Sequence, residues 1–348
     1  MSAIASPQGP LPPGADPAGP GTDDNPTVRW GEVLAAACRA PSSHNTQPWR
    51  VVLSDQHVEV RPDTDRQLAV TDPDGRELLI SCGAMVRHLA VAVRAQQLSC
   101  RTAWHLGAPG DTRAVVQVTG QARPPDQEWA RAFAVDHRTT HRGGFERRPV
   151  PPWLVEEAGQ PRQPGASVHV VADDARPAVE ALVAEGNRVQ YADPAFRGEL
   201  ASWTRASARD VRLHADGLAW FALGLSRPAT RLFRALLRHA DLGRLVAAAD
   251  RRRLRSASAL VALTTAGDRP ADWVAAGETL AALLLDLRLV GVSCAYVNQP
   301  VQVPALRGRL RALLGGDQVP QILLAVGYPS SRQRRPAPRR AVADLVER

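Results

Sequence analysis

Apolar residues recur at helical spacing in three segments of this chain. Within 29–39 they predict a short helix that ends before Pro41. The same spacing predicts two long helices, one from Leu78 to Val93 and one from Trp273 to about Val290. Such helices need a partner surface for their apolar faces, so the chain is expected to fold around a substantial core.

Shorter runs of apolar or alternating residues predict β-strands. These runs are 49–53, 57–60, 101–106, 113–119, 167–171, 295–297 and 321–326. The first two are separated by Ser54-Asp55-Gln56 alone, the spacing of a tight hairpin. The chain is therefore expected to contain both helices and strands.

The order of these elements repeats once along the chain. Each half reads as helix, loop, strand and long helix, and each long helix is followed by a Ser-Cys pair, Ser99-Cys100 and Ser293-Cys294. We therefore predict two homologous halves, 25–135 and 136–348. The second half contains an Arg-, Ala- and Leu-rich stretch at about 187–258, which we interpret as a helical insertion that adds packing or covers a binding site.

Composition limits the compartment and the partners. Residues 1–24 are rich in Pro, Gly and Ala, which predicts a disordered N-terminus, and they lack the pattern of an export signal. The longest apolar stretch, 280–292, is interrupted by Asp286 and Arg288, so no membrane partner is expected. The four cysteines show no metal or disulfide spacing. These features favour a cytoplasmic protein.

The charge distribution excludes several chemistries. The net charge is +8, and all 43 basic residues are Arg. Without Lys there is no Walker A loop, Schiff base or Lys general base, and no GxGxxG follows a predicted strand. The cluster Arg251 to Arg253 with Arg255 is typical of a solvated helix face, so no nucleic-acid partner is expected; a nucleic-acid binder would show DNA affinity that falls steeply with salt.

One loop concentrates neutral polar groups between a helix and a strand. In 40–49, Ser42, Ser43 and Asn45 offer donors and acceptors suited to the edge of a heteroaromatic ring, and Pro41 and Pro48 stiffen the backbone. The alternative interpretation is a helix stop followed by Asn and Ser turn chemistry.

A second segment, 138–142, is basic. In an extended conformation Arg138, Thr140 and Arg142 share one face, where two guanidinium groups flanking a hydroxyl suit a phosphate dianion. The alternative is a basic interdomain loop, and the run 334–340 taken alone is an ordinary charged terminus. His44, His137 and His141 show no metal spacing.

Taken together, these segments resemble the nitroreductase superfamily, and specifically its Acg-like branch of FMN-binding proteins. The resemblance rests on the loop 40–49, on 138–142 with Phe145, and on Pro338-Arg339-Arg340. Ser81 to Ala84 and Ala295 to Pro300 add support. It implies the α+β nitroreductase-like fold of FMN-dependent enzymes.

In ordinary members of this family a homodimer builds two flavin sites at its interface. Here the first half opens with Pro26 to Trp30, which lacks the phosphate motif, and the loop Gln160 to Pro164 of the second half lacks the hydroxyl and amide groups. The resemblance therefore implies a monomer that acts as its own pseudo-dimer, with a helical lid and one FMN site assembled across its halves.

The resemblance also implies roles for individual residues. Those assigned to the FMN phosphate are Arg138, Thr140, Arg142 and Arg339, with Arg340 beside them. Those assigned to the isoalloxazine and ribityl edge are Pro41, Ser42, Ser43 and Asn45, with Gln47 beside them. Asn298 and Gln299 would lie near flavin N5, where the common family pattern carries Glu-Gly instead.

The implied activity is hydride transfer from NAD(P)H through FMN to a small-molecule acceptor, a nitroaromatic, a quinone or a similar compound. FMN performs this chemistry, so no catalytic side chain is assigned. The alternative is an FMN-storage protein whose closed lid leaves little or no reductase activity.

Overall fold

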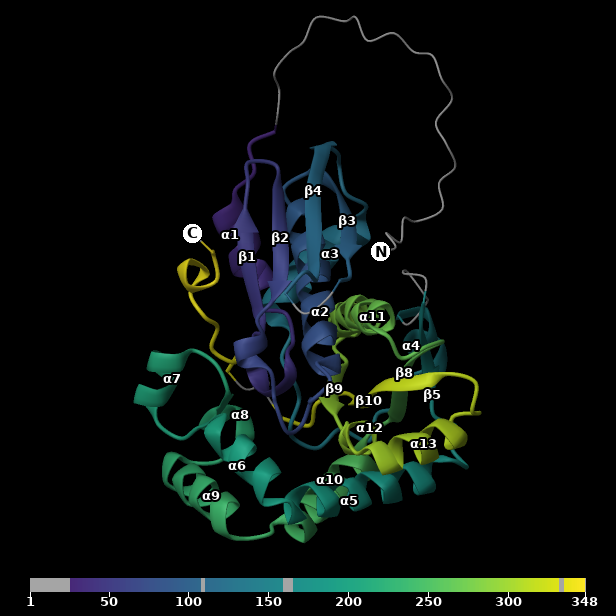
Figure 1. Ribbon diagram of the computed structural model, residues 1–348. Helices are drawn as coiled ribbons and strands as arrows, with labels where there is room; N and C mark the ends of the chain where they lie inside the picture. Colours follow the sequence, from purple (N-terminus) through teal and green to yellow (C-terminus); the bar gives the residue numbers. More distant parts are fainter. Residues whose placement is uncertain (1–25, 108–109, 159–164, 332–334, 348) are drawn as a thin grey trace, which may run out of the picture.

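The computed structural model of the chain describes residues 26–107, 110–158, 165–331 and 335–347. The predicted disorder of 1–24 and the loop Gln160 to Pro164 lie outside the described residues. The described part contains two groups that each combine a β-sheet with helices. A further group, made mainly of helices, lies below them as drawn (Figure 1).

The first half contains a four-stranded antiparallel sheet in the order β1-β2-β4-β3. Its strands are β1 (Trp49–Leu53), β2 (His57–Pro62), β3 (Leu98–His105) and β4 (Arg113–Gln121). Its helices are α1 (Trp30–Ala37) and α2 (Arg76–Arg94), and single 3-10 turns occupy Ser43–Asn45 and Thr64–Arg66. The predicted hairpin and both predicted helices are confirmed.

The second sheet has the order β5-β8-β10-β9 and is also antiparallel. Its strands are β5 (Ala166–Val170), β8 (Ala259–Thr265), β9 (Ser293–Tyr296) and β10 (Val319–Gly327). The helices around it are α4 (Pro152–Ala158), α11 (Pro270–Leu289), α12 (Gln299–Gln302) and α13 (Pro304–Leu313). In both sheets the fourth strand along the chain lies between the second and the third. In both, a long helix connects the second strand to the third.

The two long helices, α2 and α11, pack against each other through a pair of glycines. A methyl group on Gly83 would lie 2.3 Å from the Val274 carbonyl oxygen, and one on Gly277 would lie 2.0 Å from that of Ile80. The contact is reciprocal, because each glycine meets the residue three positions before the other. Only glycine permits this approach of the two backbones.

The helical insertion connects β5 to β8, where the first half has only a tight turn. Its elements are α5 (Arg176–Ala192), α6 (Pro194–Ser202), β6 (Thr204–Arg205), α7 (Ala208–His214), β7 (Leu218–Ala219), α8 (Trp220–Leu223), α9 (Arg227–His239) and α10 (Gly243–Ser256). The helical segment begins earlier than the predicted Asn187, because α5 runs unbroken from Arg176.

The C-terminal segment returns from β10 to the first half. The Val51 N–H donates to the Leu345 carbonyl oxygen at 2.8 Å, and the Glu347 N–H donates to the Val51 carbonyl oxygen at 2.8 Å. The tail, which includes a 3-10 turn at Val342–Asp344, thus pairs with the edge strand β1. A helix absent from the sequence prediction, α3 (Asp126–His137), packs on both long helices.

No helix in the described ranges has both the length and the apolar content that a membrane span requires.

Candidate functional site

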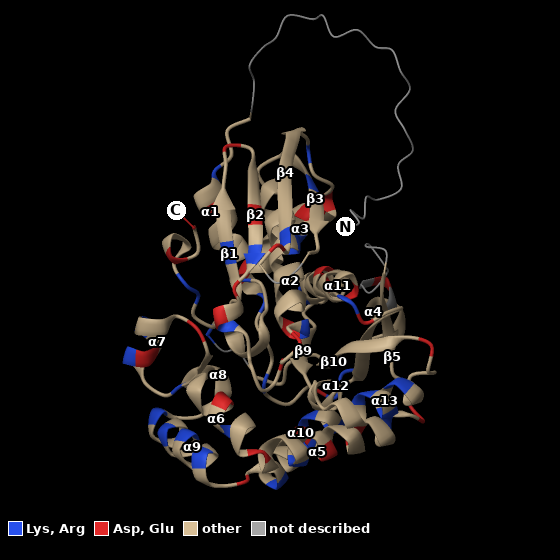
Figure 2. Ribbon diagram, viewed as in Figure 1, with Lys and Arg blue, Asp and Glu red and all other residues tan. Residues whose placement is uncertain are grey.

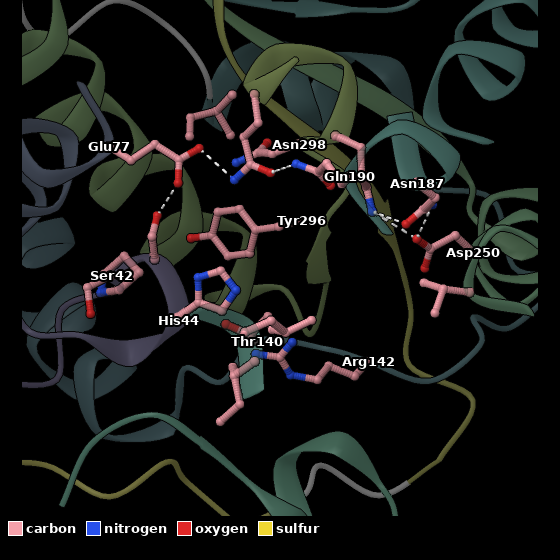
Figure 3. Close-up of a pocket in the computed structure, with 18 of the residues that line it drawn as sticks. Ser42, His44, Glu77, Thr140, Arg142, Asn187, Gln190, Asp250, Tyr296 and Asn298 are labelled. Carbon is pink, nitrogen blue, oxygen red and sulfur yellow. Dashed lines mark hydrogen bonds between the residues drawn. The ribbon is translucent and has the colours of Figure 1, made fainter. Parts of the chain in front are cut away.

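Two adjoining cavities lie where the loop 40–49, the second half and the insertion meet. The larger has a volume of about 280 Å³ and the smaller about 70 Å³. Pro41, Ser42, Thr140 and Arg142 line both, so the cavities are neighbours along one path. Figure 3 shows residues around the larger cavity.

The loop 40–49 adopts a backbone that L-residues rarely take. His44, Asn45 and Gln47 have φ values of 49°, 57° and 51°, each in the left-handed region. The Ser42 hydroxyl accepts the Gln47 backbone N–H at 3.0 Å and helps to close the loop. Three strained residues in one short loop are typical of a functional site, where surrounding contacts offset the cost.

The two amide side chains of this loop bind it to distant segments. Asn45 donates to the Pro338 carbonyl oxygen at 3.1 Å and to that of Gly217 at 3.3 Å. The Gln47 amide donates to the Ala215 carbonyl oxygen at 2.9 Å and accepts the Arg340 N–H at 2.9 Å. The loop is therefore fixed at once to the insertion and to the C-terminal tail.

The smaller cavity is lined by guanidinium groups. Arg138 donates to the Arg39 carbonyl oxygen at 3.1 Å, and Arg339 donates to the Asn45 side-chain oxygen at 2.8 Å. The Nε atoms of Arg138 and Arg339 are buried without a partner in the described structure. Arg39, by contrast, pairs with Asp136 at 2.8 Å. Arg138 and Arg339 have only neutral oxygens as partners among the described residues.

The pKa values of these buried arginines are lowered. Burial lowers the pKa of Arg138, and burial together with the charges of Arg138 and Arg39 lowers the pKa of Arg339 to about 9. A dianion bound in the smaller cavity would offset the burial and the mutual repulsion of these arginines. It would also accept hydrogen bonds from their unpartnered Nε–H groups. The arrangement suits a phosphate.

The segment 138–142 reaches this position along β9. The His141 N–H donates to the Cys294 carbonyl oxygen at 2.9 Å, which holds the segment beside the strand. Arg138, Thr140 and Arg142 all line the smaller cavity, and so does Thr139. The predicted grouping of the first three side chains around one site therefore occurs in the structure.

The larger cavity is polar near the loop. The Ser43 hydroxyl donates to one Glu77 carboxylate oxygen, and Gln302 donates to the other at 2.9 Å. The Tyr296 hydroxyl and the Nδ1 atom of His44 are buried without a hydrogen-bond partner. Burial lowers the pKa of His44 and raises that of Tyr296, so both are neutral near pH 7 and point unmet polar atoms at the cavity region (Figure 3).

The insertion provides the far wall of the larger cavity. Its apolar lining residues are Tyr191, Phe196, Leu200, Leu218, Leu223, Phe233 and Val246. Beside them, Asp250 accepts hydrogen bonds from Asn187 at 3.0 Å and from Gln299 at 2.9 Å. This part of the cavity is suited to a largely apolar molecule with a polar end.

The candidate residues divide into two groups. Those that line at least one cavity are Pro41, Ser42, Ser43, Asn45, Arg138, Thr140, Arg142, Asn298, Gln299 and Arg339. Gln47 and Arg340 line neither, because Gln47 is fully buried in the loop contacts and Arg340 donates to the Gln47 carbonyl oxygen at 3.2 Å and to that of Asp344 at 2.8 Å. Sequence reasoning missed Glu77 and the lining role of His44; no local pattern marks either.

No family model matches the chain. A protein of Mycobacterium tuberculosis named "Putative NAD(P)H nitroreductase Rv3131" is 30% identical over 341 residues, covering 93% of this chain and 92% of the relative. A second from the same organism, "Putative NAD(P)H nitroreductase acg", is 31% identical over 327 residues, covering 90% of this chain and 93% of the relative. The chain belongs to the nitroreductase family, in its Acg-like branch.

Solved structures similar to the chain include two FMN-dependent nitroreductases named NfnB. The one from Mycobacterium smegmatis, in complex with NADPH, has a TM-score of 0.41 and 16% identity, covering 63% of this chain and 97% of that one. The one from a Sphigopyxis strain has a TM-score of 0.42 and 20% identity, covering 62% and 97%.

Proposed function

We propose that this protein binds one FMN and transfers hydride from NAD(P)H to a small-molecule acceptor, a nitroaromatic, a quinone or a similar compound. One observation carries the proposal. Arg138 and Arg339 lack acidic partners in the described structure and sit at the end of a path that continues between neutral polar groups into an apolar chamber. That sequence of environments matches a phosphate, a polar heteroaromatic ring and an organic acceptor.

The residues present fit the cofactor. Arg138, Arg142, Arg339 and Thr140 would hold the phosphate, and the loop residues Pro41, Ser42 and Ser43 would meet the ring edge. FMN supplies the capacity to accept and donate hydride. The positive charge of the arginines favours an anionic ligand.

The chain's own polar groups orient whatever enters the larger cavity. Neutral His44 and Tyr296 each present an unmet hydrogen-bonding atom to it, and Asn298 is fixed because its side-chain oxygen accepts the Leu323 N–H at 2.8 Å. Names of relatives support the same activity: the similar M. tuberculosis proteins are named NAD(P)H nitroreductases, and the NfnB structures are described as FMN-dependent.

We also propose that the halves act as a pseudo-dimer with one site per chain. The shared strand order and the reciprocal Gly83 and Gly277 contact support it. Counting from those glycines, Trp104 stands where Asn298 stands in the second half. The Trp104 indole donates to the buried Glu278 carboxylate at 2.7 Å, so a large side chain fills the corresponding place of a second site.

Flavin titration tests this proposal. The parent should bind one FMN per chain, followed by quenching of flavin fluorescence. Arg138→Ala should weaken binding by about 1.5 to 3 kcal/mol, because a charge-assisted phosphate contact is lost. Arg123→Ala, at an exposed arginine that lines neither cavity, is the matched control and should bind as the parent does. A colourless protein that refuses added FMN would refute the assignment.

The second candidate function is FMN storage under a closed lid. It is favoured by the bonds from the insertion to the loop, among them the Gly217 N–H donating to the Asn45 carbonyl oxygen at 3.2 Å. Mixing the flavin-loaded protein with NADPH and then NADH without oxygen separates the two. Rapid loss of oxidised flavin absorbance supports the reductase, and its persistence with both donors supports storage.

A further inference from the structure

Most of the net positive charge of this protein lies in the insertion. Residues 176–256, which span α5 to α10, contain 15 arginines and 8 acidic residues, so they carry +7 of the whole net charge of +8. The rest of the chain is nearly neutral, with 28 basic and 27 acidic residues. Figure 2 shows the arginines of α9 and α10 on the lowest part of the molecule as drawn.

Helix α9 separates its side chains into three faces. Arg227, Arg231, Arg234 and Arg238 recur at intervals of four, three and four residues, so they form one stripe. The inner face carries Thr230 and Leu237, which are fully buried, and Phe233, which lines the larger cavity.

The outward face of α9 is apolar and exposed. Leu232 and Leu236 are 60% and 41% exposed, and Pro228, Ala229 and Ala235 beside them are also exposed. A solvent-facing strip of this kind on a helix that has an arginine stripe is typical of a segment that lies in a membrane interface. The long arginine stems can reach the headgroups while the leucines enter the acyl boundary.

We propose that α9 docks this protein on an anionic phospholipid surface. The positive charge of the insertion is complementary to anionic headgroups. The exposed leucines would gain an apolar environment from the lipid, which a purely electrostatic partner does not offer. The arginine stripe and the exposed leucines lie on the surface of one helix, so the association is peripheral. This inference revises the sequence-based expectation of no membrane partner, which rested on the lack of a spanning segment.

Duplex DNA is the competing occupant for a basic face. DNA affinity would depend on the arginines through phosphate contacts and would not require Leu232 or Leu236. A lipid surface requires both residue types, since leucine burial and arginine attraction act together. The two occupants therefore predict different responses to the same pair of variants.

Sedimentation with vesicles tests the proposal on the full-length protein. The parent should bind vesicles of equal parts phosphatidylglycerol and phosphatidylcholine and not vesicles of phosphatidylcholine alone. Arg231→Gln with Arg238→Gln should weaken binding about 25-fold, from about fivefold per arginine. Leu232→Ser with Leu236→Ser should weaken it about tenfold or more. All four side chains are exposed, so the fold should persist, as circular dichroism can verify.

Matched controls remove the same groups elsewhere. Arg101→Gln with Arg123→Gln, and Leu289→Ser with Leu313→Ser, alter exposed residues outside the insertion and should leave vesicle binding unchanged. Failure to bind anionic vesicles, or binding that the leucine variant retains in full, would overturn the proposal. So would binding of duplex DNA that is lost only in the arginine variant while vesicles stay unbound.

Discussion

Replacing Gly277 with alanine places a methyl group against the backbone of the facing helix. The new Cβ would lie 2.0 Å from the Ile80 carbonyl oxygen, whereas ordinary contacts begin at 3.4 Å, so the helices must separate by about 1.4 Å at this point. Neither side of the contact can rotate away, since both are helical backbone. We expect a loss of about 3 kcal/mol in the free energy of unfolding, at the upper end for overpacking.

Urea unfolding followed by circular dichroism measures this loss. Gly198→Ala in α6 is the control, because nothing lies within 4 Å of its added methyl group; there we expect a gain of about 0.5 to 1 kcal/mol from helix propensity. Gly83→Ala should lower the free energy of unfolding about as much as Gly277→Ala does. The double variant should lose less than the sum of the two, because one separation of α2 from α11 makes room for both methyl groups. Equal stability of the Gly277 and Gly198 variants would refute the reasoning.

Three further predictions concern buried polar groups. Burial and the Glu77 carboxylate raise the pKa of Asp72 to about 7; a carboxyl raised above its unfolded value of about 3.9 contributes stability at low pH that is lost as pH rises through about 7. Asp72→Asn should therefore flatten the decline in melting temperature between pH 5 and pH 8, and an unchanged decline would contradict this. Arg131→Met should destabilise the fold by about 3 to 5 kcal/mol, because Arg131 donates to both Asp286 oxygens at 2.7 and 2.9 Å and its loss leaves a buried carboxylate; adding Asp286→Asn should recover part of the urea midpoint, and no recovery would show that the pair is not the cause. Tyr296→Phe should change stability by less than about 0.5 kcal/mol, because the hydroxyl has no partner in the described structure; a larger loss of melting temperature would show that it is bonded within the protein.

Periodicity predicted the elements whose apolar faces are continuous. The β1–β2 hairpin and the long helices α2 and α11 follow from it directly. Helix α3 was not predicted. Its largest apolar residues, Trp129 and Phe133, are 42% and 64% exposed, so they do not mark a buried face at helical spacing. Strand β8 was not predicted, because its short run of Ala, Leu, Val and Thr is buried on both faces and shows no alternation of apolar and polar residues.

The candidate site was predictable only where a local motif carried it. The segment 138–142 and the loop 40–49 are such motifs, and both line cavities. Arg339 meets Asn45 across 294 residues, and the insertion wall depends on how distant helices pack. Gln47 and Arg340 turn away from the cavities because the left-handed backbone at Gln47 directs its side chain to the tail, which no spacing rule anticipates.

The pairing of the segment 335–347 with β1 has a consequence for the smaller cavity. Leu345 and Glu347 bond to Val51, and Arg339 lines the cavity, so one segment joins the edge of the first sheet to the cavity wall. Detaching this segment from β1 would also withdraw Arg339. The edge of the first sheet and the retention of any ligand that Arg339 holds are therefore coupled.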